Sequence, residues 1–314
     1  MIKTRLKIIA AALILLMCIP GCRLMQPKKG LDSEPEKIEY RKGTHALEMA
    51  FLENFPRDEI KEGQAFQAII EVQNKGAYDI NDLVLSLTGI KEQYTQVLDQ
   101  PKLKIIENLA GKSLDYPEGS KEIVTFNLKN EKRLPTDKHT ELIKIDACYK
   151  YQTIASAEIC INPSSQIVVA QSAISCPQDK TVSLSGGQGA PIAITKIEQI
   201  TTPVNIEQGI YELDLKLHIS HLGKGNVFLE QGCNNGGIVR IQDINFHNYQ
   251  LGRGISCDFE GERTFVLEKK DNILKCNAQI DSAIGTFTTP LIITLEYWYE
   301  DSISKTIEVE KTQP

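Results

Sequence analysis

Most of the chain beyond residue 44 alternates apolar and polar residues, and this pattern limits the fold more than any other feature. Residues 66–73 alternate up to a turn sequence at 74–76, and longer runs of the same kind cover residues 143–151 and 211–219. A period of two predicts strands that bury one face, whereas an amphipathic helix repeats about every 3.6 residues. No segment of ordinary helix length shows the helical period. The chain is therefore predicted to be all-β and built from antiparallel sheets.

The predicted strands follow one another at short intervals through turns rich in Gly, Asn and Asp, which is typical of a β-sandwich. Between residues 163 and 189 the composition shifts to Ser, Gln, Gly and Pro, so we expect a linker there. The sequence thus predicts two immunoglobulin-like antiparallel β-sandwich domains in series, the first over residues 45–162 and the second over residues 190–311.

The two predicted domains also resemble each other in sequence. Residues 143–151 and residues 291–299 carry apolar residues in phase, and both segments end in two alternate tyrosines. Gly76 and Gly223 follow an earlier strand at corresponding places in the two domains. We interpret these matches as an internal repeat of one sandwich module, in which each tyrosine-ending strand is followed by a short turn and a final strand.

The N-terminal segment has the features of an export signal. Three basic residues within the first seven positions precede an apolar run over residues 8–19. This run is shorter than the roughly 20 residues that a membrane-spanning helix requires. Residues 1–21 are therefore predicted to be a cleaved signal peptide, and the polar residues 22–44 are predicted to be a flexible tether.

The end of this signal, Ile19-Pro20-Gly21-Cys22, resembles the lipobox of prokaryotic lipoproteins. In that family the Cys becomes the lipidated first residue of the mature chain, so the resemblance implies lipid attachment at Cys22. Acyl chains on Cys22 would hold the exported protein at the outer face of the cytoplasmic membrane, because their methylenes enter the bilayer. Ordinary signal cleavage and an uncleaved N-terminal anchor are the alternatives.

A second resemblance concerns the predicted first domain. Glu62-Gly63, the alternating strand after it and residues 72–88 resemble the CARDB and S-layer-associated immunoglobulin-like modules of prokaryotic, especially archaeal, surface proteins. These families contain adhesion-related or spacer modules without chemistry. The resemblance therefore implies a non-enzymatic module for envelope interaction, adhesion or assembly, whose partner is an envelope protein or a glycan. The alternative is a surface module that binds a carbohydrate or protein ligand through the second domain.

The cysteines also indicate an exported chain. Of the eight cysteines, Cys18 is expected to leave with the signal and Cys22 to carry lipid, so that six remain. An even set in an exported chain predicts disulfides. A hairpin whose turn centres on Ile154 would bring one pair face to face, and another hairpin would bracket a second pair. The predicted bridges are Cys148–Cys160, Cys257–Cys276 and, by exclusion, Cys176–Cys233.

Charge and motifs argue against several other functions. The net charge is −6 at pH 7 and no basic face is evident, which disfavours a nucleic-acid partner. His218 and His221 form an HxxH sequence, but on a strand this odd spacing sends the two side chains to opposite faces. We therefore do not expect the two histidines to share a metal ion, and we predict that they lie at the surface or at a strand end. No acid pair stands out, and the sequence has neither a nucleophile elbow nor a phosphate-binding loop, so we expect neither catalysis nor a cofactor.

Trp298 is the only Trp and the one residue singled out as a candidate partner contact. It lies on the strand face opposite Tyr297 and Tyr299. If these tyrosines point into the core, Trp298 points outward or against the neighbouring domain. An exposed indole offers a large aromatic surface to a sugar or a protein, and packing between the domains is the alternative.

Overall fold

The computed structural model describes residues 40–131, 134, 136–163, 179–230, 232–246, 254–267, 271–281 and 286–312. The predicted signal peptide, Cys22 and most of the predicted tether lie outside these residues. The chain divides into Met1–Glu39 and one compact unit, Tyr40–Pro314, and only the latter is described below. All 18 elements of its described residues are strands, which confirms the all-β prediction. In the part of the chain that is described, no helix is long and apolar enough to cross a membrane.

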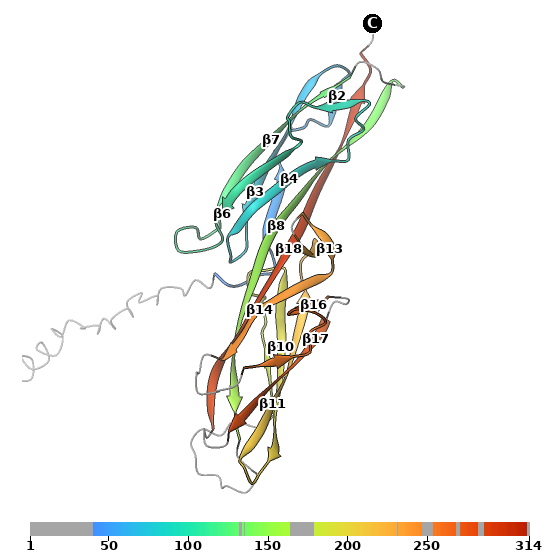
Figure 1. The fold of residues 1–314 in the computed structure, drawn as a ribbon. Coiled ribbons are helices and arrows are strands. Elements are labelled where there is room, and N and C mark those ends of the chain that lie inside the picture. The colour runs from blue at the N-terminus through green and yellow to red at the C-terminus, as the bar shows by residue number, and fades with distance from the viewer. Residues whose placement is uncertain are drawn as a thin grey trace, which may run out of the picture. The chain divides into compact units, whose positions relative to one another are not determined.

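Two unusually long strands organise the unit (Figure 1). Strands β8 (Lys138–Ile161) and β18 (Phe287–Glu310) have 24 residues each and pair antiparallel over their whole length. At about 3.4 Å per residue, each strand is about 80 Å long. We call this pair the ribbon. At its centre Tyr149 pairs with Tyr299, and Lys150 pairs with Trp298.

One half of the unit joins the ribbon along β8. Strand β4 (Ile80–Thr88) pairs with residues 144–150 of β8 and carries β6 (Leu103–Leu109) on its other side. Four further strands form a separate antiparallel sheet in the order β1-β3-β7-β5, with the bounds Leu47–Phe51, Ala65–Asn74, Lys121–Asn130 and Thr95–Val97. We call these strands the N-terminal half.

The other half joins the ribbon along β18. Strands β12 (Asn226–Glu230) and β14 (Ile238–Phe246) pair with residues 298–300 and 291–296 of β18, respectively. Strand β13 (Asn234–Gly236) extends β12, and β16 (Thr264–Val266) extends β14. A separate sheet has the order β15-β17-β11-β10-β9, with the bounds Ser256–Cys257, Asp271–Asp281, Ile210–His221, Ile192–Asn205 and Asp179–Ser183. We call these strands the C-terminal half.

The ribbon supplies buried side chains to both halves. Alternate residues of β8 over 143–159, and of β18 over 291–299, are buried. Alternate apolar residues over 68–72 of β3 and over 213–217 of β11 belong to the same hydrophobic core. The period-two pattern therefore identified the inward face correctly, because in a strand successive side chains point to opposite faces.

The predicted turns within the two ribbon segments were wrong. We expected β8 to fold back at Ile154, but it continues as one strand. Thr153 is polar but occupies a buried position of the alternating pattern. Its hydroxyl can be buried because it donates to the carbonyl of Ile192 at 2.6 Å and also contacts the Tyr297 hydroxyl at 2.9 Å. No Gly, Pro, Asn or Asp stands between positions 151 and 155, so the chain has no residue that favours a turn there. The predicted turn near position 301 is likewise absent from β18.

The predicted linker at 163–189 is more ordered than we expected where the structure describes it. Strand β9 lies within it and pairs with β10. The glycine segment after β9 is hydrogen-bonded to the N-terminal half: the Gly43 N–H donates to the Gly186 carbonyl at 2.7 Å, and the Ala77 N–H donates to the Gly189 carbonyl at 2.9 Å. This segment therefore attaches one half to the other, and the first half cannot end at residue 162 as an independent sandwich because residues 299–310 of β18 pair with its part of β8.

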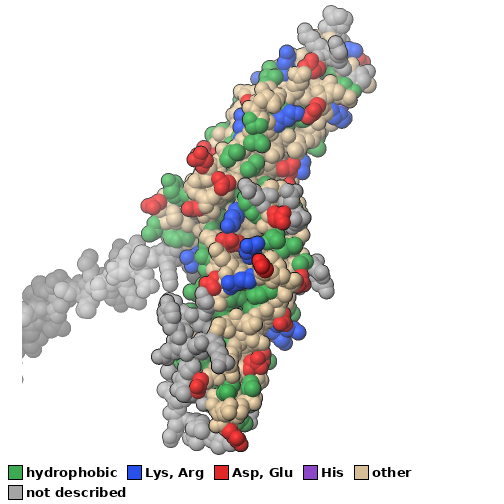
Figure 2. Space-filling model, in the orientation of Figure 1, with side chains coloured by type: hydrophobic (Ala, Val, Ile, Leu, Met, Phe, Trp, Pro, Cys, Tyr) green, Lys and Arg blue, Asp and Glu red, His purple; other side chains and the backbone are tan. Residues whose placement is uncertain are grey.

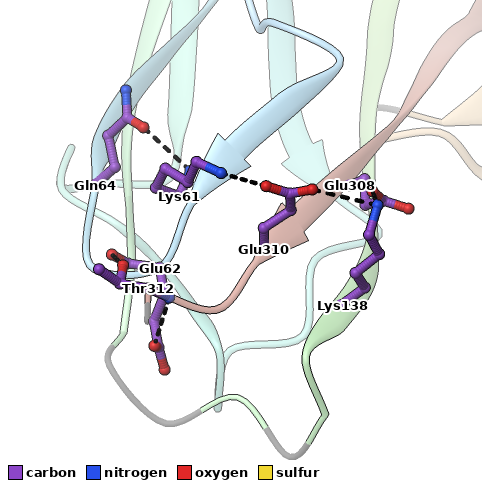
Figure 3. A network of polar contacts seen from close by, with 7 residues as sticks. All are labelled: Lys61, Glu62, Gln64, Lys138, Glu308, Glu310 and Thr312. Atoms are coloured by element: carbon purple, nitrogen blue, oxygen red, sulfur yellow. Dashed lines mark hydrogen bonds and ion pairs between the residues drawn. The ribbon is translucent and has the colours of Figure 1, made fainter. Parts of the chain in front are cut away.

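A polar network closes the end of the ribbon where β8 begins and β18 ends (Figure 3). Strand β2 (Glu59–Lys61) pairs parallel with residues 308–310 of β18. Lys61 and Lys138 both form ion pairs with Glu310, and their hydrogen bonds hold the pKa of this carboxyl below its usual range. Thr312 donates from its N–H to the Glu62 carboxylate at 3.3 Å. These contacts fix the C-terminal end of β18 to the N-terminal half.

Candidate functional site on the outer face of the ribbon

Four tyrosines fill the inner face at the centre of the ribbon. Tyr149 and Tyr151 come from β8, Tyr297 and Tyr299 come from β18, and all four are buried. Neighbouring ring centroids lie 6.0–6.3 Å apart at steep angles. Edge-to-face aromatic pairs at this distance are favourable. The cluster therefore packs the core at the place where the strands of the two halves meet on the ribbon.

The same contact between a tyrosine and a glycine occurs once in each half. A Cβ atom on Gly76 would lie 1.9 Å from the Tyr151 hydroxyl, and one on Gly223 would lie 2.2 Å from the Tyr299 hydroxyl. The N–H two residues after each glycine donates to that hydroxyl, at 3.2 Å and 2.9 Å, respectively. This shared geometry supports the internal repeat, and it explains why both positions require glycine.

Ionisable groups adjoin two of the tyrosine hydroxyls. The Tyr149 hydroxyl donates to Asp301 Oδ2 at 2.7 Å, and burial raises the pKa of the Asp301 carboxyl. The Tyr299 hydroxyl accepts a backbone N–H, so its own proton is available for His221 Nε2 at 2.9 Å. Burial lowers the pKa of His221, which favours the neutral ring that can accept this proton. His221 ends β11 as expected, whereas His218 is buried beside Glu198, so its predicted surface position was wrong.

Trp298 lies on the opposite, outward face of the same strand. Tyr297 and Tyr299 are only 2% and 1% exposed, whereas Trp298 is partly exposed. The predicted orientation of Trp298 is therefore confirmed. Trp298 lines a hollow of about 190 Å³, which we call the Trp298 pocket, and its other lining residues are Lys150, Leu229, Arg240, Glu296 and Tyr297.

The charged side chains of the Trp298 pocket are unevenly paired. Lys150 Nζ lies 3.3 Å from Glu296 Oε2. Arg240 is directly opposite Glu296 in the register of β14 with β18, yet within the described residues its guanidinium forms no hydrogen bond or ion pair. The indole N–H of Trp298 has no hydrogen-bond partner there either. Figure 2 shows basic side chains gathered beside acidic and hydrophobic ones over the middle of the ribbon.

A disulfide fixes the strand pair that carries one wall of this pocket. Leu229 belongs to β12, which pairs with β13, and Cys233 in the turn between them is bonded to Cys148 of β8. Cys148 lies two residues from Lys150, on the same outward face. The Cys148–Cys233 bridge therefore ties the β12–β13 turn to the strand beside the pocket floor.

This bridge corrects two of the predicted pairings. Cys148 and Cys160 are 12 positions apart in one straight strand, about 40 Å, whereas disulfide Cα atoms lie within about 7 Å. Cys233 bonds to Cys148 and so cannot bond to Cys176, which lies outside the described residues. Cys160 is disulfide-bonded as well. The Cys257–Cys276 bridge is confirmed. The unbroken alternation through position 154 was the sequence signal against the Cys148–Cys160 pair.

Polar residues continue the surface beyond the Trp298 pocket. Trp298 is opposite Lys150, which is opposite Asn81 of β4, which in turn is opposite Asn108 of β6. Residues directly opposite each other share one face of a sheet. The Asn108 side-chain amide donates to Asn81 Oδ1 at 2.8 Å. A strip of one aromatic, one basic and two amide side chains thus crosses four strands.

The N-terminal half has a larger pocket of about 410 Å³, lined in part by the exposed side chains of Phe55 and Leu98. Three of its amide side chains already form hydrogen bonds with the protein. Gln67 donates to Asn127 at 2.9 Å, and the oxygen of Gln64 accepts the Lys61 N–H at 3.1 Å. Within the described residues the Arg57 guanidinium of this larger pocket also has no hydrogen bond or ion pair. The Trp298 pocket is the stronger candidate for ligand recognition because it adds a partly exposed indole to its basic side chains.

Comparisons with known proteins give little further information. No protein-family model and no curated protein matches the chain. Among solved structures, the secreted serine protease VesC from Vibrio cholerae is 10% identical with a TM-score of 0.21, covering 83% of this chain and 51% of its own. The CupB6 tip adhesin from Pseudomonas aeruginosa is 8% identical with a TM-score of 0.21, covering 87% of this chain and 99% of its own. The chain thus spans about half the length of the first of these two, and TM-scores this low support no argument about function.

The described residues contain no group of three or more His, Cys, Asp or Glu side chains placed to hold a metal ion. HxxH does not form one, since His218 contacts Glu198 and His221 contacts Tyr299.

Proposed function

We propose that the protein is a non-enzymatic, membrane-anchored cell-surface protein that acts in envelope interaction, adhesion or assembly. In this proposal it consists of two immunoglobulin-like modules, and lipid on Cys22 holds it at the outer face of the cytoplasmic membrane. The resemblances to the lipobox and to CARDB modules support the anchor and the class of module.

The observation that carries the proposal is the shared ribbon. Its two 24-residue strands run through both halves, and the Cys148–Cys233 bridge crosses it near the centre. Disulfides are typical of proteins outside the reducing cytosol. The continuous strands and the buried tyrosines limit bending between the halves. Limited bending suits a protein that must hold a binding surface at a fixed place in the envelope.

Cell fractionation tests the anchor and the location. We expect the wild-type chain in the membrane fraction, and we expect protease added to intact cells or spheroplasts to reach it. Cys22→Ser should move the protein out of the lipidated membrane pool, whereas Cys18→Ser is the matched control because Cys18 is expected to leave with the signal. A protein that stays in the cytoplasm with reduced cysteines would contradict the proposal, and envelope crosslinking followed by affinity purification would identify the partner.

The Trp298 pocket favours a second candidate function, a surface module that binds a carbohydrate or protein ligand through its C-terminal half. Trp298 is partly exposed, and Arg240 beside it has no ion pair among the residues that the structure describes. Trp298→Ala should abolish binding in a glycan or envelope-protein screen. Tyr116→Ala is the control, since Tyr116 is an exposed aromatic residue in the N-terminal half. Equal binding by both variants would argue against this function.

A further inference from the structure

We propose that the Trp298 pocket binds a sugar residue that carries a carboxylate, such as a uronic acid within an acidic glycan. This inference rests on the second candidate function above and names the ligand class for its site. Three features of the pocket support it: an aromatic surface, unpaired donors with a net positive charge, and a small volume.

The aromatic surface is provided by Trp298. One face of a pyranose ring presents C–H groups, and an indole offers a broad, flat, apolar partner for such a face. Phe228 is directly opposite Trp298 in the pairing of β12 with β18, so aromatic residues stand side by side at this edge. On the other side of Trp298 the polar strip of Lys150, Asn81 and Asn108 offers hydrogen bonds to sugar hydroxyls.

The charged groups select an anion. Lys150 and Arg240 outnumber Glu296 among the lining residues, although the chain as a whole has a net charge of −6. Lys150 is engaged by Glu296, whereas the Arg240 guanidinium has no hydrogen bond or ion pair with the residues that the structure describes. A guanidinium can bind a carboxylate through two parallel hydrogen bonds, which are stronger than hydrogen bonds between neutral groups. The free indole N–H adds one more donor, so the ligand must supply acceptors.

The size of the pocket matches a single sugar ring of a longer glycan. Its volume of about 190 Å³ is below the roughly 300 Å³ at which pockets for drug-sized molecules begin. The pocket is also held in shape, because the Cys148–Cys233 bridge ties the β12–β13 turn to β8. A wall that is already in place reduces the ordering cost of binding.

Trp298 is the only Trp, so its fluorescence reports directly on this pocket. The experiment titrates the full-length protein in detergent with galacturonate oligosaccharides, with galactose oligosaccharides of equal length as the neutral probe. We expect a saturable change in Trp emission with the acidic probe and a weaker response to the neutral one. Arg240→Gln should weaken acidic binding up to about fivefold, because Arg240 is exposed and a solvent-exposed charge pair contributes up to about 1 kcal/mol.

Arg57→Gln is the matched control, because Arg57 lines the other pocket, and it should bind like the wild type. Both variants must first show the wild-type circular dichroism and thermal transition. Equal responses to acidic and neutral sugars, an Arg240→Gln variant with unchanged affinity, or tighter binding of an acidic peptide than of the acidic sugar would each overturn the inference. No response to any sugar would overturn it too, while the fractionation result with Cys22→Ser would still decide the surface location independently.

Discussion

Removing the Cys148–Cys233 bridge is the most informative perturbation of the fold, because its effect on stability can be worked from the structure. The bridge joins residues 85 positions apart, and the chain-entropy relation assigns a loop of that length about 4.5 kcal/mol at 25 °C. For a unit of this size each kcal/mol corresponds to about 2 °C in Tm. The double variant Cys148→Ser with Cys233→Ser should therefore melt about 9 °C lower than the wild type.

The second bridge provides the control. Cys257 and Cys276 are 19 positions apart, for which the same relation gives about 3 kcal/mol and about 6 °C. Differential scanning calorimetry and urea unfolding of both double variants measure the two losses. The reasoning is refuted if loss of the long bridge costs no more stability than loss of the short one, or if peptide mapping of the oxidised wild type recovers Cys148 bonded to Cys160.

Three further predictions follow from the tyrosine cluster and the ribbon. Gly76→Ala should cost at least about 2 kcal/mol in urea unfolding, since its Cβ would lie 1.9 Å from the Tyr151 hydroxyl, and Tyr151→Phe should restore part of the loss when the two are combined. Burial lowers the pKa of His221 below its usual 6.5, so as the pH falls the unfolded chain takes up a proton on this side chain before the folded chain does. The free energy of unfolding should therefore decrease as the pH drops through 6.5, and His221→Gln should reduce this dependence on pH. A fragment of residues 45–162 should give no cooperative thermal transition, because it lacks the part of β18 that pairs with its last strand, and a stably folded fragment would contradict the shared ribbon.

Most of the strand content could be predicted from sequence because alternation is a local signal. The buried phase over 143–151 and 211–219 is read from neighbouring residues alone, and the structure buries the same positions. The orientation of Trp298 followed from the same rule. These predictions needed no knowledge of which strands pair.

Partner choice could not be predicted in the same way, since it depends on residues far apart in the chain. We placed a turn at Ile154, which would bring Cys148 and Cys160 face to face, and the predicted pairing failed with that turn. The correct partner, Cys233, sits in a turn that reaches Cys148 only because β12 pairs with β18 and β18 pairs with β8. Arg240 was missed for the same reason, since its place beside Trp298 arises from the pairing of β14 with β18.

Mass spectrometry of the N-terminal peptide from the purified membrane fraction tests the proposed function most directly. We expect the mature chain to begin at Cys22 and this residue to carry acyl groups. An unmodified Cys22, or a chain that retains residues 1–21, would contradict the proposal of a lipid-anchored surface protein.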